Sequence, residues 1–166
     1  MKKIISIFMA VMMLFCFASC GKAENNDEKK PADTPKTIGT KLATEFKEIA
    51  ADFDTSEEIA TKLSQNEAVT FSPATMPVEE GMLTGFGNTE IKGFSEGTMF
   101  SPMIGTIPFV SYVFVLKDDT DAKEFVSTLE SNADMRWNIC TEAEEKLVET
   151  VDNKVFFIMC PKAIEE

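Results

Sequence analysis

The chain is predicted to fold as an α+β domain in two layers, with N-terminal helices and a mostly antiparallel sheet. Apolar residues follow a helical spacing between residues 42 and 66. After residue 90, three segments are rich in β-branched and aromatic residues, and one further helical segment separates them. The C-terminal half is therefore expected to have the order β-α-β-β.

Two helices are expected at the start of the domain. Apolar side chains recur at intervals of three and four residues, which places them on one helix face. These residues are Leu42, Phe46, Ile49 and Phe53. Thr55 followed by Glu58 has the spacing of a capping box and predicts a second helix through about Asn66.

The next segment is expected to pass from extended chain into a short helix. Residues 67–76 have the pattern of an extended connection. Pro77 suits the first turn of a helix, so a short helix is predicted through Leu83. Gly85 and Gly87 would end this helix in a turn.

The second half of the chain is predicted to supply the strands. Ile91–Phe100 is expected as a strand in which Gly93 and Gly97 indicate bulges. The nearly continuous apolar run Phe109–Lys117 predicts a central strand buried on both faces. A helix should follow over residues 121–132.

A hairpin is expected at the end, with strands 146–151 and 154–160 joined by the turn pair Asp152-Asn153. A strand-helix-strand crossover is right-handed, so strand 146–151 should run parallel to strand 109–117. The last strand should then be antiparallel to both, with the helices packed on one face of the sheet.

Residues 1–19 have the features of a bacterial lipoprotein signal peptide. Two lysines precede a 14-residue apolar run, Ile4–Phe17, and the small residues Ala18 and Ser19 precede Cys20. The run is shorter than the about 20 apolar residues of a transmembrane helix. Cleavage before Cys20 would leave a lipid-modified cysteine as membrane anchor. An ordinary secretory signal cut after Ala18 or Ser19 is the alternative.

Residues 20–37 are expected to be the lipidated cysteine and a flexible spacer, because they contain no large apolar residue after Cys20. Residues 38–166 are then a single α+β domain. The protein is accordingly predicted to lie in the cell envelope, on the extracytoplasmic side of a bacterial membrane.

The chain is strongly acidic. Its net charge of −12 becomes about −14 without residues 1–19, which carry two lysines and no acid. With a single arginine and no basic stripe, no nucleic-acid partner is expected. Such a chain is repelled by anionic headgroups, so the lipid on Cys20 must provide the membrane attachment. The acidity is explained by solubility, and binding of a cation or basic peptide is the alternative.

Cys140 and Cys160 are the two cysteines of the folded part. Export would permit a disulfide between them, and closing this loop could stabilise the fold by about 3 kcal/mol. The predicted topology places both at the same edge of the sheet. In a reducing niche both would instead be small buried thiols. The sequence leaves both states open.

The absence of histidine excludes several enzyme classes. Gly93–Gly97 matches the G-x-S-x-G pattern of a nucleophile elbow, but no histidine base exists and no helix is expected after it. Cys-His proteases and histidine-ligated zinc are excluded for the same reason, and two cysteines cannot complete a zinc site. No cofactor is expected.

Two clusters remain as candidate sites. Asp118, Asp119 and Asp121 offer oxygen ligands for calcium, although capping of the following helix is the simpler explanation. Arg136 and Trp137 are residue types common at binding hot spots and predict an interaction edge. Alternatively, Trp137 closes the end of the sheet and Arg136 pairs with a nearby acid.

Three segments resemble an uncharacterised family of small bacterial lipoproteins, a domain of unknown function. They are SEEIATKLSQN (56–66), YVFVLKDDTDAKEFVSTLE (112–130) and ADMRWNICTEAEEKLVETVDNKVFFIMCP (133–161). The resemblance implies extracytoplasmic anchoring and a small α+β fold. It implies no activity, cofactor or functional residue.

Two functional hypotheses follow. The first is a non-enzymatic, lipid-anchored binding module for an unknown protein or small-molecule ligand. The second is a carboxylate-based hydrolase of cell-wall or environmental glycan. It requires two carboxylates that converge in a cleft, one of them with a raised pKa.

Overall fold

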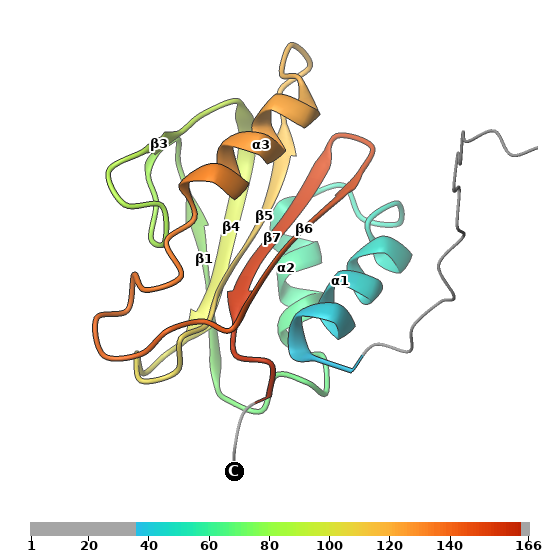
Figure 1. The fold of residues 1–166 in the computed structure, drawn as a ribbon. Coiled ribbons are helices and arrows are strands. Elements are labelled where there is room, and N and C mark those ends of the chain that lie inside the picture. Colours follow the sequence, from blue (N-terminus) through green and yellow to red (C-terminus); the bar gives the residue numbers. More distant parts are fainter. Residues whose placement is uncertain (1–35, 164–166) are drawn as a thin grey trace, which may run out of the picture. The chain divides into compact units, whose positions relative to one another are not determined.

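A five-stranded sheet with the strand order β1-β4-β5-β7-β6 organises the domain (Figure 1). The structure, a computed structural model, describes residues 36–163. Its strands are β1 (Pro73–Val78), β4 (Phe94–Pro102), β5 (Val110–Leu116), β6 (Glu145–Val151) and β7 (Lys154–Cys160). Neighbouring strands are antiparallel, and β6 runs in the direction of β5 because β7 lies between them. The α+β class and the predicted strand directions are confirmed.

Three helices of the described chain also lie where the sequence predicts them. They are α1 (Ile38–Ile49), α2 (Ser56–Ser64) and α3 (Ala122–Asn132). The side chains of Thr37, Thr55 and Asp121 cap them by accepting backbone N–H groups of the first turn. The predicted hairpin turn is present as well, with Asp152 at a φ of 54°.

The first face of the sheet is covered by α1 and α2, as expected. Leu42 and Phe46 of α1 and Ile59 of α2 are fully buried against aromatic side chains of the sheet. The rings of Phe46 and Phe156 stack with centroids 5.5 Å apart. This cluster forms the part of the core that lies between the sheet and the two N-terminal helices.

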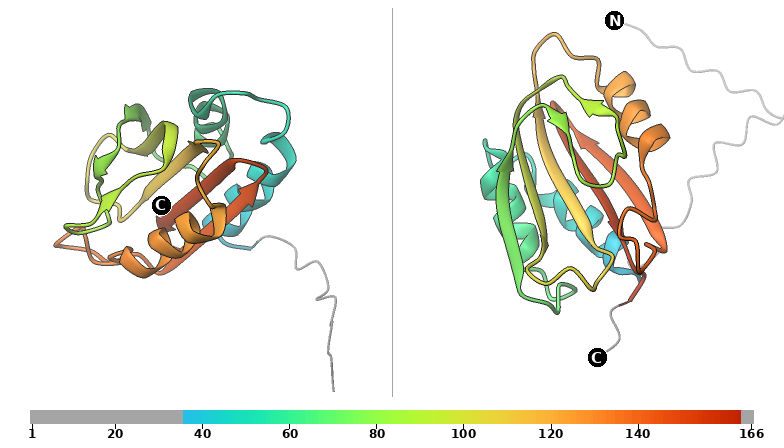
Figure 2. Two further views of the ribbon diagram at one scale, coloured as in Figure 1. Left: turned by 90° about the horizontal axis from the view of Figure 1, so that it is seen from above. Right: turned by 90° about the vertical axis from the view of Figure 1, so that its left-hand side faces the viewer.

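The second face is covered too, which differs from the expectation that the helices pack on one face. Figure 2 shows α3 and the ribbon of β2 (Gly81–Met82) and β3 (Glu90–Ile91) on the side opposite α1 and α2. Phe125 and Leu129 of α3 join Tyr112 and Phe114 there. Strand β5 is apolar at nearly every position, so both of its faces need cover.

The short helix predicted from Pro77 to Leu83 is wrong. Pro77 lies in β1, and β2 begins at Gly81. Strand β1 is an edge strand paired only with β4, where a missing N–H is tolerated. The turn at Gly85 and Gly87 is present without a helix, with φ angles of 93° and 57°.

The two glycines of the predicted strand 91–100 have different roles. Gly93, with a φ of 102°, separates β3 from β4, and the strand register shifts between Phe94 and Glu96. Gly97 lies in regular pairing. A Cβ at Gly97 would lie 2.8 Å from both the Phe94 ring and Val78, so Gly97 makes room for close packing.

Three long connecting segments lie at one end of the sheet, and we call it the loop end. Segments 65–72, 103–109 and 133–144 lie there, at the lower edge of Figure 1. Helix α1 also begins there, because the Ile38 N–H donates to the carbonyl of Lys162, 3.1 Å away, just after β7. The loop end is therefore where the N-terminal part of the chain enters the domain.

Candidate functional site

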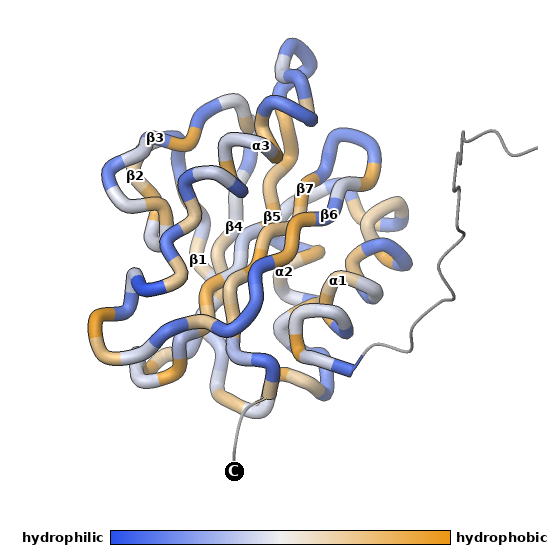
Figure 3. Tube along the Cα trace, viewed as in Figure 1, coloured by the Kyte–Doolittle hydropathy of each residue, from blue (hydrophilic) through white to orange (hydrophobic). Residues whose placement is uncertain are grey.

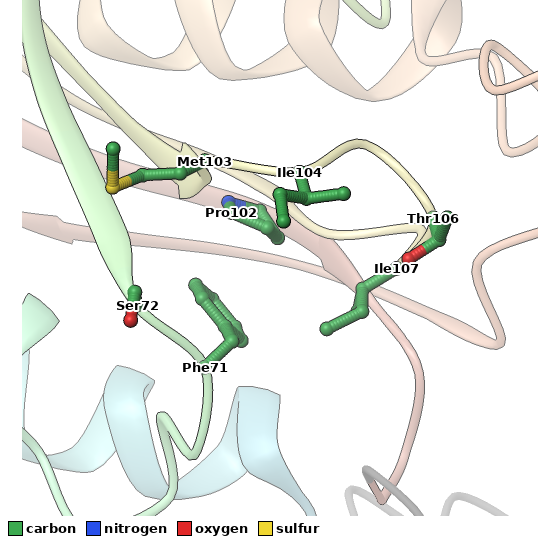
Figure 4. A pocket seen from close by; sticks show the side chains of 7 residues that line it. All are labelled: Phe71, Ser72, Pro102, Met103, Ile104, Thr106 and Ile107. Carbon is green, nitrogen blue, oxygen red and sulfur yellow. The ribbon is translucent and has the colours of Figure 1, made fainter.

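An apolar groove of about 500 Å³ opens at the loop end (Figure 4). It lies between the segment before β1 and the β4–β5 loop. The hydroxyls of two residues are its polar side-chain groups, and none of its lining residues is charged. The lining residues are Phe71, Ser72, Pro102, Met103, Ile104, Thr106 and Ile107.

Backbone and ring contacts hold the walls of the groove. The Met103 N–H donates to the carbonyl of Ser72 over 3.1 Å, which joins the β4–β5 loop to the start of β1. The ring of Phe71 packs edge-on against Phe109, with centroids 4.8 Å apart. Phe71 and Ile107 also pack on the core beneath α1 and α2. The floor is thus part of the core, whereas the rim projects from it.

A second hollow of about 170 Å³ adjoins the groove, with Pro102 and Ile107 lining both. Trp137 and Asn138 of the α3–β6 loop form its other wall. The side-chain amide of Asn138 donates to the carbonyl of Gly105, 2.9 Å away. This hydrogen bond joins two loops that are distant in the sequence into one surface.

The rim of this surface is strongly apolar. Met103 is 72% exposed, Ile104 75% and Ile139 93%. They are three of the five large apolar side chains that are exposed in the described residues, and the other two lie on β1 and β2. Figure 3 shows hydrophobic segments in both loops. Apolar exposure on this domain is therefore concentrated at the loop end.

The predicted interaction edge lies beside this groove, in the α3–β6 loop. Trp137 is half-buried and packs on the core of the second face. Arg136 is exposed, and its Nε lies 3.7 Å from the Glu142 carboxylate. Trp137 lines the hollow and also packs on the core, and Arg136 contacts a nearby acid. Both contacts match the alternative, and the interaction edge stays a prediction.

The two cysteines of the domain are both free thiols in the structure. Cys140 is exposed in the α3–β6 loop, whereas Cys160 is buried at the end of β7. The proposed bridge is therefore absent here, and Cys160 has the role of a small core residue. Burial, and then the adjacent charge of Glu145, raises the pKa of the Cys160 thiol.

The aspartates before α3 lie at the opposite end of the sheet. The Asp121 carboxylate accepts the N–H groups of Lys123 and Glu124 at 2.8 and 3.0 Å. These hydrogen bonds lower the pKa of Asp121. Asp118 and Asp119 are exposed. Within residues 36–163, no three acidic or cysteine side chains cluster closely enough for metal binding.

The G-x-S-x-G segment begins at Gly93, just before β4, and continues into that strand. The Ser95 hydroxyl donates to the carbonyl of Val115, 3.1 Å away. Nearby, Glu80 accepts hydrogen bonds from Lys117 Nζ at 2.7 Å and from the Gly93 N–H at 2.6 Å. These contacts, Lys117 first, lower the pKa of Glu80. The segment therefore has a structural role.

No sequence motif predicts the groove. The segment Ser101–Phe109 carries no charge and two prolines, in a chain of which 27% is charged. That is a signal for an unusual loop, but it does not reveal a groove. The walls of the groove come from the segment before β1 and the segment after β4, and these are brought together only in the folded domain.

No protein family, curated protein or solved structure matches the chain. The resemblance to small lipoproteins accordingly stays a prediction. The signal peptide, Cys20 and residues 20–35 of the spacer lie outside the described residues. In the part of the chain that the structure describes, no helix has the length and apolar character needed to cross a membrane.

Proposed function

We propose that the chain is a lipid-anchored, extracytoplasmic binding protein whose domain holds an apolar ligand at the loop end. The observation that carries this proposal is the uncharged groove with a protruding apolar rim. The signal-peptide features that precede Cys20 support the anchor.

The composition of the groove favours an apolar ligand. Its lining offers aromatic, aliphatic and thioether carbon and only two hydroxyls. A charged ligand would lose its hydration there without gaining a partner. An apolar ligand would release water from Met103 and Ile104, which otherwise stay exposed to solvent.

The same composition favours a binding role over catalysis. Acid–base or nucleophilic chemistry requires titratable groups close to the bound substrate. Neither the groove nor the hollow beside it has such a side chain in its lining. The apolar surface can hold a ligand, and it offers no group that would transform one.

No observation favours the glycan hydrolase. A hollow beside β4 contains Glu79 and Glu80, which are neighbours in sequence. A general acid needs a raised pKa, whereas contacts with Lys117 and Gly93 lower the pKa of Glu80. A second acidic hollow is lined by Glu57 and Glu58 on the solvent side of α2, and both are exposed.

The proposal can be tested with the uncharged dye Nile red and the purified protein. Wild type should bind the dye with a blue shift of its emission. The double variant Met103→Asp/Ile104→Asp should bind about tenfold more weakly, because two apolar contacts become charged. Met82→Asp is the matched control, since Met82 is 69% exposed on β2 and lies outside the groove.

All three proteins should melt at closely similar temperatures, because the altered side chains are exposed. Equal dye binding by all three would contradict the proposal. Equal loss of binding in the double variant and in the Met82 control would also contradict it.

A further inference from the structure

We propose that the loop end docks on the lipid bilayer itself, with Met103, Ile104 and Ile139 inserted among the lipids. This inference rests on the lipid anchor of the proposed function. It names the lipid surface as the partner of the apolar groove and its rim.

The first supporting observation is where the chain enters the domain. Residues 21–35 lead from the predicted anchor to the described domain, and 15 extended residues reach at most about 50 Å. They join α1 at the loop end, where Ile38 contacts Lys162. The opposite end lies farther away by about one strand length, roughly 23 Å for the seven residues of β5. A spacer with the coil character predicted from the sequence has a root-mean-square span of only about 20 Å. This span is comparable to the length of the sheet, so the spacer favours an orientation with the loop end toward the lipids.

The second observation is the shape of the apolar surface. The exposed side chains project from two separate loops that the Asn138–Gly105 hydrogen bond holds together. Loops with aliphatic tips can enter the boundary between headgroups and acyl chains, where burial of the tips is favourable. The open groove between Phe71 and Ile104 has room for part of an acyl chain. Trp137 lines the adjoining hollow, and tryptophan is a residue type enriched at membrane interfaces.

The third observation is the distribution of charge. Segment 101–109 and the lining of the groove are uncharged, so Met103 and Ile104 can enter the lipid without a charged neighbour on their own loop. Asp134, Glu142 and Glu144 flank the loop end and are exposed. They should limit insertion to the tips and weaken docking as the fraction of anionic lipid rises.

The test uses the mature lipidated protein reconstituted in phosphatidylcholine–phosphatidylethanolamine vesicles. In a Cys140→Ser background, Ile104→Cys carries an environment-sensitive fluorophore at the loop end. Asp119→Cys carries it at the opposite end as the matched control. Cys160 is buried and should not react. Brominated acyl chains should quench the fluorophore at position 104 about threefold or more beyond that at position 119.

The outcomes separate this inference from the proposed function. If the protein floats with the vesicles and both fluorophores are quenched equally, docking of the loop end is refuted while the anchor stands. If shielding at position 104 appears only after addition of envelope proteins, the partner is a protein and lipid docking is refuted. If the mature protein without a fluorophore does not float with the vesicles at all, the proposed lipid anchor is refuted, and docking of the loop end is refuted with it.

Discussion

The free energy of unfolding is expected to fall steeply above about pH 9 because of the Cys160 thiol. This side chain is fully buried, and its sulfur lies 3.4 Å from Glu145 Oε1. Burial, followed by the charge of Glu145, raises the thiol pKa in the folded protein. In the unfolded chain a thiol ionises near pH 8.5. The unfolded state therefore loses a proton that the folded state keeps.

The sign and size of the effect follow from this difference. The contribution of Cys160 to stability is fully present below the unfolded pKa and is lost as pH rises toward the folded pKa. Each pH unit in this window costs about 1.36 kcal/mol. Between pH 8 and pH 10.5 the loss is about 2.5 kcal/mol. Tyr112, whose pKa is also raised by burial, adds a smaller loss that begins near pH 10.

Denaturant unfolding of wild type and Cys160→Ala at both pH values, with reductant, isolates the thiol. Wild type should lose about 2.5 kcal/mol more than the variant over this range. Cys140→Ser is the control and should keep the full wild-type loss, because Cys140 is exposed. Equal losses in wild type and Cys160→Ala would show that the buried thiol is not the cause of the pH dependence. A wild-type loss that appears only with reductant would indicate that the two cysteines are bridged.

Two further substitutions test the packing and capping of the domain by thermal or denaturant unfolding. Gly97→Ala should cost about 1–3 kcal/mol, because its methyl group would lie 2.8 Å from neighbouring side chains. Gly105→Ala, which meets open space, is its control, and a neutral Gly97→Ala would contradict the packing. Asp121→Ala should cost about 1 kcal/mol by removing the α3 cap. Asp119→Ala should change little, and equal costs for the two aspartates would argue against capping.

Residues with strong local patterns were sufficient to predict most of the fold. The helical spacing around Phe46, the cap at Thr55 and the turn at Asp152 act over a few residues. The apolar run of β5 predicted a strand buried on both faces. That prediction already implied a second covering layer, which the expectation of helices on one face did not include.

The failed prediction concerns a residue whose local preference is ambiguous. Pro77 fits the first turn of a helix and an edge strand equally well. The strand is selected because β1 pairs with β4. Along most of this ladder the paired residues are 20 or more positions apart in the sequence. Such long-range pairing leaves little trace in a local pattern.

The groove could not be predicted for a related reason. Phe71 and Ile104 are far apart in sequence, and the Ser72–Met103 hydrogen bond joins their segments only in the folded domain. Trp137, which lines the adjoining hollow, could be predicted because its residue type is common at binding hot spots. The aliphatic rim could not be predicted, because single exposed aliphatic residues form no motif.

Lipid anchoring at Cys20 can be measured by metabolic labelling with a clickable fatty acid in a bacterial host, comparing wild type with Cys20→Ser. Wild type is expected to carry the label and Cys20→Ser to lack it, and protease added outside the cytoplasmic membrane should degrade the wild-type domain. An unlabelled wild-type protein that is protected inside the cell would contradict lipid anchoring at Cys20.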